Sequence, residues 1–190
     1  MTLEPGGDRR VPLVERQAAG ERLKFVCFWS HEPRGSGVLG PWLLSQWFPA
    51  PFEFEGISYP TAEHWMMAEK ARIFGDSEAV DRVLAARHPG EAKAIGGQVR
   101  GFDEREWTRC RTDVAVQGNV LKFTQNPELG EWLVGTGERV LVEASPRDRI
   151  WSCGLEERDP RIESIEAWPG LNLLGFALMD ARAALVGGPL

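Results

Sequence analysis

The fold of this chain is decided by Ser58–Ala71, whose sequence is SYPTAEHWMMAEKA. Pro60 disfavours helical geometry at Tyr59, so the segment is expected to begin as extended chain. Thr61 is a good N-cap, because its hydroxyl can accept a hydrogen bond from a free N–H group of the first helical turn. No Gly or Pro interrupts residues 62–74, which favours a helix of about three turns or more there.

The predicted helix carries charge on a face that also carries apolar residues. At a period of about 3.6 residues, one stripe consists of Glu63, Met67, Lys70 and Phe74. Glu63 and Lys70 are seven residues apart, so they point almost the same way and lie about 10 Å apart along the axis. A carboxylate and an ammonium group that face inward are costly unless they pair or line a cavity.

A second interpretation rotates the helix, so that both charges lie in water and Trp65, Met66 and Ala68 pack inward. Runs of charge are more often solvated faces than sites, and spacing alone favours this interpretation. Evidence for a cavity must therefore come from other parts of the chain.

The composition limits the possible functions. A length of 190 residues is enough for one domain that buries roughly 70% of its unfolded surface. The net charge of −6 argues against broad duplex binding but allows a small anionic ligand in a local basic pocket. Three separated cysteines are typical of reduced thiols in a cytoplasm, and no apolar run is long enough to span a membrane. Neither a metal site nor a cofactor is predicted.

The remaining pattern predicts short strands among several helices. Residues 1–20 have no period and are expected to be a flexible tail before a domain of residues 21–190. Strands are expected at residues 23–29, 52–59 (a hairpin about Gly56) and 140–144. Further helices are expected at residues 77–86 (capped by Ser77), 91–95, 104–124, 129–133 and 172–186. This order indicates an α+β fold, mostly helical, with a small sheet.

Three other residues are candidates for a site. Asp148 lies in a polar loop, where Asp is common as a turn residue. The functional interpretation is that Trp151, three residues on, fixes this loop against a pocket and holds the Asp148 carboxylate at its rim. Trp107 follows a turn and is more often a core residue than a ligand platform. Two indoles with two carboxylates suit a planar heterocycle, because stacking holds the base and acids act on the bond that leaves it.

Several motifs in order resemble the YbiA-like or NADAR proteins, a family named for NAD and ADP-ribose chemistry. The resemblance runs from about residue 25 to residue 185. The motifs are LLSQWFPAPF (Leu43–Phe52), YPTAEHWMMAEKARIFGD (Tyr59–Asp76), EW (Glu106–Trp107), NVLKFTQNPEL (Asn119–Leu129), SPRDRIWSCGL (Ser145–Leu155) and NLLGFALMDAR (Asn172–Arg182).

The resemblance implies hydrolysis of an N-glycosidic bond between ribose and a nitrogen base. Some family members cleave phosphoribosylamino-pyrimidine intermediates of riboflavin synthesis, and others resemble hydrolases that remove ADP-ribose from guanine. The motifs imply a functional set of Glu63, Trp107, Asp148 and Trp151. Lys70 matches the family's helix lysine, which implies phosphate binding or attack on ribose C1 to form a Schiff base.

The substrate implied is a ribosyl or ADP-ribosyl small molecule, with nucleic acid possible only as a modified substrate. Arg34, Arg100 and Asn172 complete the expected binding residues. Two positions depart from the family pattern. Gly96-Gly97 stands where relatives often have Gly-Arg, so Arg100 is a candidate replacement for a phosphate-binding arginine, and Ser152 replaces a usual glycine. A module that binds ADP-ribose without hydrolysis is the alternative class.

Overall fold

The computed structural model describes residues 7–33 and 39–187. Within these residues the chain forms the α-helices α1 (Val11–Ala18), α2 (Ala62–Ile73), α3 (Ser77–Ala85), α4 (Pro89–Gly96), α5 (Glu104–Gln125), α6 (Pro127–Gly135) and α7 (Leu173–Gly187). The strands are β1 (Phe25–Phe28), β2 (Phe52–Phe54), β3 (Ile57–Tyr59) and β4 (Val140–Glu143). Short 3-10 turns occupy Pro41–Leu44, Pro160–Glu163 and Ile165–Ala167.

Two small sheets stand among these helices, which confirms the predicted α+β class. Strands β1 and β4 pair in parallel, with Phe25 opposite Val140 and Phe28 opposite Glu143. Strands β2 and β3 form the predicted antiparallel hairpin. Its two turn residues, Glu55 and Gly56, both have positive φ, at 50° and 76°, as a tight hairpin turn between right-twisted strands requires.

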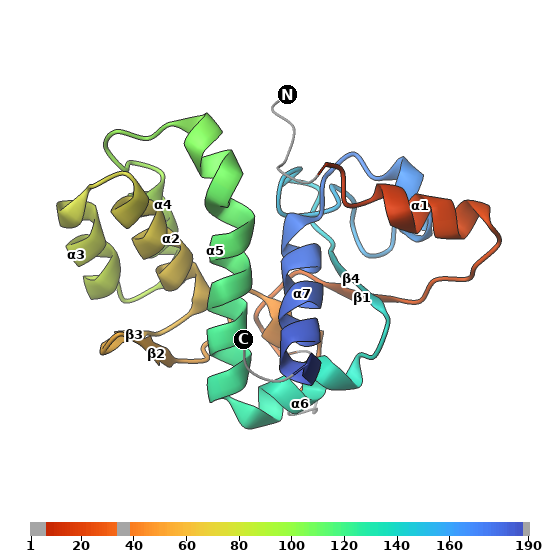
Figure 1. The fold of residues 1–190 in the computed structure, drawn as a ribbon, viewed down its shortest axis with the longest axis horizontal. Helices are drawn as coiled ribbons and strands as arrows, with labels where there is room; N and C mark the ends of the chain where they lie inside the picture. Colours follow the sequence, from red (N-terminus) through yellow and green to blue (C-terminus); the bar gives the residue numbers. More distant parts are fainter. Residues whose placement is uncertain (1–6, 34–38, 188–190) are drawn as a thin grey trace.

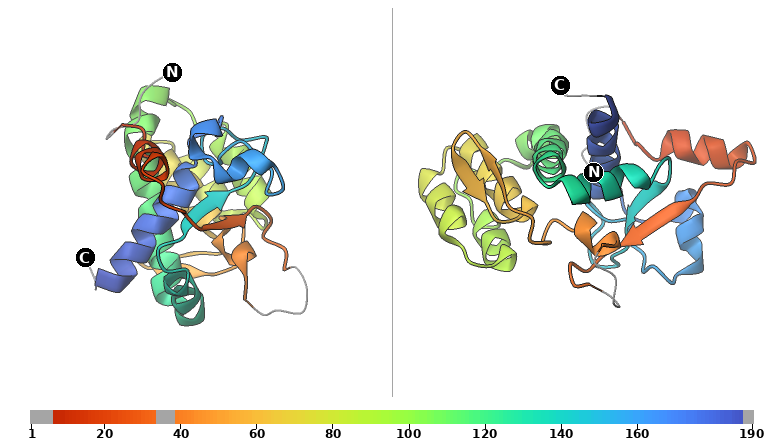
Figure 2. Two further views of the ribbon diagram at one scale, coloured as in Figure 1. Left: turned by 90° about the vertical axis from the view of Figure 1, so that its right-hand side faces the viewer. Right: turned by 90° about the horizontal axis from the view of Figure 1, so that it is seen from below.

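Helices α5 and α7 stand side by side in the middle of the molecule (Figure 1). Helices α2 to α4 and the β2–β3 hairpin lie on one side of this pair, and α1, β1 and β4 lie on the other. The views from the side and from below show the same division (Figure 2). The arrangement places the start of α2 and the end of β4 where they can share a cavity.

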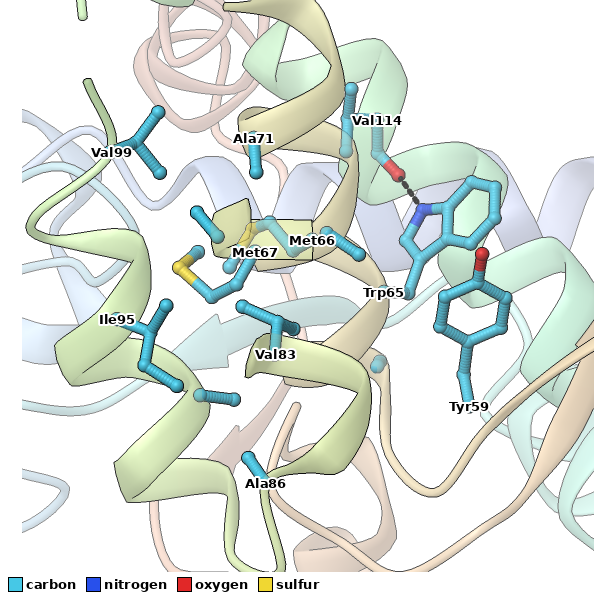
Figure 3. Packing of buried hydrophobic residues seen from close by; sticks show 14 of the residues in the cluster. Tyr59, Trp65, Met66, Met67, Ala71, Val83, Ala86, Ile95, Val99 and Val114 are labelled. Atoms are coloured by element: carbon cyan, nitrogen blue, oxygen red, sulfur yellow. Dashed lines mark hydrogen bonds between the residues drawn. The ribbon is translucent and has the colours of Figure 1, made fainter. Parts of the chain in front are cut away.

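Helix α2 is enclosed by its neighbours over most of its length, since residues 62–68 are all buried. Figure 3 shows Met66 and Met67 among side chains of α3 and α4, with Trp65 directed toward α5. The Trp65 Nε1–H donates to the carbonyl of Val114 at 2.9 Å. Gly118 makes room for the Trp65 indole, because a Cβ at that position would overlap the ring. Gly118 is therefore present in the interior of α5 for packing.

Both interpretations of α2 are partly correct. Trp65, Met66 and Ala68 pack inward, as the rotated helix requires. Glu63 is nevertheless only 3% exposed, and Lys70 is half-buried. Because neighbouring elements cover α2 on all sides, its apolar residues and Glu63 can be buried at the same time on different faces.

The expectation of a flexible tail is wrong for residues 11–18, which form helix α1. Leu13 is buried in a core cluster with residues of β4 and α7. The Arg10 guanidinium donates to the carbonyls of Trp168 and Gly170 at 2.8 and 3.0 Å. Eight residues are too few for a stable isolated helix, so these distant contacts stabilise α1. The local sequence pattern therefore does not predict this helix.

The other helix boundaries differ from the predictions by a few residues. Asp76, not Ser77, caps α3, because its side chain accepts the Ala79 N–H. Helices α4 and α6 each begin at a proline, two residues earlier than predicted, since Pro fits the first turn of a helix without loss of a hydrogen bond. In the part of the chain that the structure describes, none of the helices has the length and apolar character needed to cross a membrane.

Candidate functional site

A cavity of about 760 Å³ lies between helices α2 and α4 on one side and the end of β4 with its following loop on the other. One boundary, here called the helix wall, consists of residues of α2 and α4: Glu63, Met67, Lys70, Lys93, Gly96 and Gly97. The opposite boundary, the loop wall, consists of the end of β4 and the loop after it: Glu143, Ser145, Arg147, Asp148, Ile150 and Trp151. The cavity is also lined by Trp107 of α5, the segment 45–47, residues 29–31 after β1, Met66 and Leu174.

Glu63 lies in the first turn of α2, directly beside the cavity. Thr61 caps this turn through the His64 N–H, and the Glu63 N–H donates to the Gln46 carbonyl at 3.0 Å. Its Oε1 is buried and has no hydrogen-bond partner among the described residues. Burial raises the pKa of Glu63 to about 7, while the Lys93 charge and a hydrogen bond from Trp47 oppose that rise. This carboxyl can exchange a proton near neutral pH.

Lys70 lines the same cavity about two turns farther along α2. Its Nζ donates to the Gly96 carbonyl at 2.8 Å, where the positive charge also favours the C-terminal end of α4. The ammonium lies 4.2 Å from the ring centroid of Phe102 and 5.7 Å from that of Trp107. Burial lowers the pKa of Lys70. The predicted stripe of Glu63 and Lys70 thus faces one cavity.

Lys93 is a second cation of the cavity, and the sequence analysis did not predict it. Lys93, one turn before Gly97, lines the cavity, and its charge lowers the pKa of Glu63. Arg100 is not among the lining residues. Its guanidinium is bound to Asp76 at 2.6 Å and to Glu78 at 3.1 Å, and its side chain is 67% exposed. Arg100 therefore does not replace the missing arginine of the Gly96-Gly97 turn. Arg34 lies outside the described residues.

Glu143, the last residue of β4, is the principal site residue that the sequence analysis missed. Its Oε2 is buried and has no hydrogen-bond partner within the described residues. Burial raises the pKa of Glu143 to about 8, and the nearby charges of Asp148 and Glu63 add to that rise. One signal was available, because ligands often bind at the carboxyl ends of parallel strands. The ends of both β1 and β4 line this cavity.

Asp148 is a turn residue and also lies at the cavity. Its Oδ1 accepts the backbone N–H groups of Ile150 and Trp151 at 2.7 and 2.8 Å, so it is a turn residue. It also lines the cavity together with Trp151. Its charge raises the pKa of Glu63, which requires the two carboxyls to be close. The same hydrogen bonds that make the turn therefore aim the Asp148 carboxylate toward the site.

The departure at Ser152 stabilises this loop. The Ser152 hydroxyl is fully buried and accepts the N–H groups of Ser145 and Gly154 at 2.9 and 3.1 Å. It lies 2.6 Å from the Glu143 carbonyl, to which it can donate. A serine at this position thus ties the two ends of the loop wall together.

The two predicted indoles both line the cavity. Trp107 is 7% exposed and packs in the core cluster that contains α2. Trp151 is half-buried and contacts that cluster and a second one around α7. Trp107 is therefore a core residue with one part at the cavity, whereas Trp151 presents more of its surface to a ligand.

Asn172 does not line the cavity, contrary to its predicted binding role. It is fully buried, its Oδ1 accepts the Glu143 N–H at 3.0 Å, and its Nδ2 donates to the Leu141 carbonyl at 2.9 Å. Its φ of 54° is in the left-handed region, which Asn tolerates better than most residues. Asn172 is thus a positioning residue for β4 and Glu143.

Lys122 has a similar positioning role for the segment 45–47, and the sequence analysis did not single it out. This fully buried lysine donates to the carbonyls of Leu43 and Ser45 at 2.7 and 2.9 Å. Burial lowers the pKa of Lys122 to about 7. Within the described ranges, no three His, Cys, Asp or Glu side chains form a group that would hold a metal ion.

This chain is similar to several known proteins. The NADAR domain profile matches residues 27–186. An N-glycosidase of Acanthamoeba polyphaga mimivirus is 38% identical over 167 residues, which cover 85% of this chain and 96% of the viral protein. A chloroplastic riboflavin biosynthesis protein of Zea mays, PYRR, is 34% identical over 138 residues, or 69% of this chain and 20% of that protein.

The fold is also similar to a solved structure. The NMR structure of the Escherichia coli protein YbiA superimposes with a TM-score of 0.69, covers 87% of both chains and is 23% identical in sequence. This similarity supports the α+β architecture independently of the motifs.

Proposed function

Because the chain belongs to the NADAR domain family and is an N-glycosidase, we propose that its substrate is a phosphoribosylated amino-pyrimidine of the kind formed in riboflavin synthesis. The observation that supports this proposal best is the cavity itself. The buried carboxyl of Glu63, whose Oε1 has no hydrogen-bond partner among the described residues, lines it with two lysines and two indoles. The relationship to a riboflavin biosynthesis protein of maize supports the choice of base.

The reaction breaks the bond between ribose C1 and nitrogen. Positive charge develops on the sugar ring as this bond lengthens, and negative charge develops on the departing base. Glu63 is the group in this proposal that stabilises the sugar cation and takes a proton from the attacking water. Its pKa of about 7 leaves a substantial fraction ionised at neutral pH.

The cations of the cavity define the phosphate end of the substrate. Lys70 and Lys93 project from the helix wall, and Arg147 lies on the loop wall. Ammonium groups bind phosphate as point charges, and a guanidinium can bind it with two hydrogen bonds. In this proposal Lys70 and Lys93 hold the phosphate. Because the chain as a whole has a net charge of −6, the attraction for phosphate must come from the local cations of this cavity.

The indoles define the other end. A base stacked on one aromatic face gains about 1–3 kcal/mol. Trp151 is the better platform because it is less buried than Trp107. Asp148 beside it would position the ribose hydroxyls. We also propose a cytoplasmic location, for which the three free cysteines are the supporting observation.

The proposal is tested by a product assay with the purified protein. The panel contains a phosphoribosylamino-pyrimidine, the same compound without phosphate, and DNA that carries ADP-ribose on guanine. We expect release of ribose 5-phosphate from the first compound with the highest kcat/KM. Preferential release of ADP-ribose from DNA would replace the proposed substrate by the modified nucleic acid. Tight binding without any product would contradict hydrolysis.

A further inference from the structure

We propose that Glu143 is the acid that protonates the departing base, a role that rests on the proposed function and deepens it. None of the sequence motifs quoted above contains this residue. The inference comes from where the end of β4 places a second buried carboxyl.

The backbone of Glu143 is held by three side-chain and main-chain contacts in addition to its strand. Asn172 accepts its N–H, and the Cys153 N–H donates to its carbonyl at 3.0 Å. The Ser152 hydroxyl lies 2.6 Å from the same carbonyl. All three partners come from beyond the strand, so the tertiary structure fixes where this side chain starts. A proton donor needs such fixed placement, because a displacement of about 1 Å weakens catalysis strongly.

The side chain itself is unsatisfied. Oε2 of Glu143 is buried without a hydrogen-bond partner in the described part of the chain, and so is Oε1 of Glu63 across the cavity. A buried carboxylate without donors is unfavourable, whereas a buried carboxylic acid can donate to a ligand. Both carboxyls line one cavity, so the arrangement is prepared for a ligand that accepts a proton on one side.

The electrostatics agree with this division of roles. The charged groups that face Glu143 are Asp148 on the loop wall, Lys93 from α4 and Glu63 from α2. Two carboxyls that interact share protons, and the pair holds one more readily than two isolated groups would. Glu63 lies in the first turn of α2, where the helix dipole favours its anion, and Trp47 donates a hydrogen bond to it. Glu143 ends a strand and has neither support within the described residues, so it is the better acid and Glu63 the better base. Lys70, Arg147 and His31 are the other titratable groups that line the cavity.

Asp148 is less suited to this role. Its Oδ1 already accepts two backbone N–H groups, which commits this carboxyl to holding the turn. Oε2 of Glu143 has no donor among the described residues, and burial raises the pKa of this carboxyl to about 8. Asp148 therefore holds the loop beside the substrate, and Glu143 supplies the proton.

The proposed step is balanced. The C1–N bond breaks, its electron pair goes to nitrogen, and the Glu143 carboxyl proton transfers to that nitrogen. A water oxygen bonds to C1, and one water proton passes to the Glu63 carboxylate. The products are the free amine and ribose phosphate with a C1 hydroxyl. Return of the proton from Glu63 to Glu143 restores the starting state, and the net change is the addition of one water molecule.

The test compares Glu143→Gln with the wild-type protein on the substrate that the panel assay identifies. Glutamine keeps the shape but cannot donate this proton as an acid, so we expect kcat to fall about 10²–10⁴-fold. In the wild type we expect the rate to fall at alkaline pH as Glu143 loses its proton. We expect this alkaline limb to be absent in Glu143→Gln. The matched control is Glu131→Gln, an exposed glutamate of α6 outside the cavity.

A second variant keeps the test decisive if Glu143→Gln does not fold. Glu143→Asp keeps an acid but withdraws it by one methylene, so we expect a lower kcat with the alkaline limb retained. Wild-type kcat and an unchanged pH profile in either variant would overturn the role of Glu143 while leaving N-glycoside hydrolysis in place. A wild-type protein that is inactive on every compound of the panel would overturn the proposed function and this role together.

Discussion

The helix wall and the loop wall of the cavity each hold one buried glutamate, but they hold it by different means. Glu63 is placed by local structure, namely the Thr61 cap and the first turn of α2. Glu143 is placed by residues far along the chain, of which Asn172 is 29 positions away. The difference shows that one site can be half encoded in a local sequence pattern and half in tertiary contacts.

The largest expected effect comes from the helix wall. Glu63→Gln removes the proposed base and should lower kcat about 10²–10⁴-fold. The fold should persist, because glutamine fills the same volume and the start of α2 is held by the backbone contact to Gln46. Steady-state kinetics beside a thermal melt check this result. A folded variant with a near-normal rate would exclude Glu63 from the chemistry.

Loss of the Asn172 hydrogen bonds should destabilise the loop wall more than loss of the Thr61 cap destabilises the helix wall. Asn172→Gly keeps the positive φ but leaves the Glu143 N–H and the Leu141 carbonyl without their partner. An unsatisfied buried group costs about 1–3 kcal/mol. The free energy of unfolding should fall by more than for Thr61→Ala, where loss of a helix cap costs about 1 kcal/mol. Urea titrations of both variants make the comparison, and equal losses would remove the distinction between the walls.

The indole of the loop wall should affect substrate binding. Trp151→Ala removes the proposed stacking platform and should lower kcat/KM by roughly 5- to 150-fold, the equivalent of about 1–3 kcal/mol. Trp132→Ala, which removes an indole of α6 that does not line the cavity, is the control. If both variants lose activity equally, the Trp151 effect is one of stability.

A smaller effect concerns stability as a function of pH. Its sign should be the same for both walls, because burial raises the pKa of Glu63 and that of Glu143. Burial raises the pKa of Glu63 from 4.5 to about 7, so the folded protein keeps a proton that the unfolded chain releases. The resulting stabilisation is complete below the unfolded pKa and is lost as the pH rises through about 7. The wild type should therefore lose stability between about pH 5 and pH 7, and Glu63→Gln should lose less. Urea unfolding across this range is the measurement, and identical slopes would contradict the raised pKa.

The smallest effect is expected at Arg100, which is outside both walls. Arg100→Gln removes an exposed cation bound to Asp76 and should leave kcat and KM within about twofold of the wild type. A rise in KM confined to phosphorylated substrates would instead return Arg100 to the phosphate site.

What the sequence predicts follows the same division. The Thr61 cap and the α2 stripe were visible because helical periodicity is local, and Asp148 and Trp151 were visible because their motif is short. Glu143 ends a four-residue strand and looks like any strand residue until β4 is paired with β1. Asn172 and Arg100 have side chains that suit binding, yet each has another partner that only the tertiary structure reveals. Helix α1 was missed for the same reason, since its stability depends on residues 168–170.

The most direct test of this account is a crystal structure of Glu63→Gln with intact substrate. The account predicts ribose C1 beside residue 63 and the base against Trp151, with the phosphate near Lys70 and Lys93. Substrate bound instead in the open groove of about 810 Å³ beside residues 20–25, which neither Glu63 nor Glu143 lines, would contradict it.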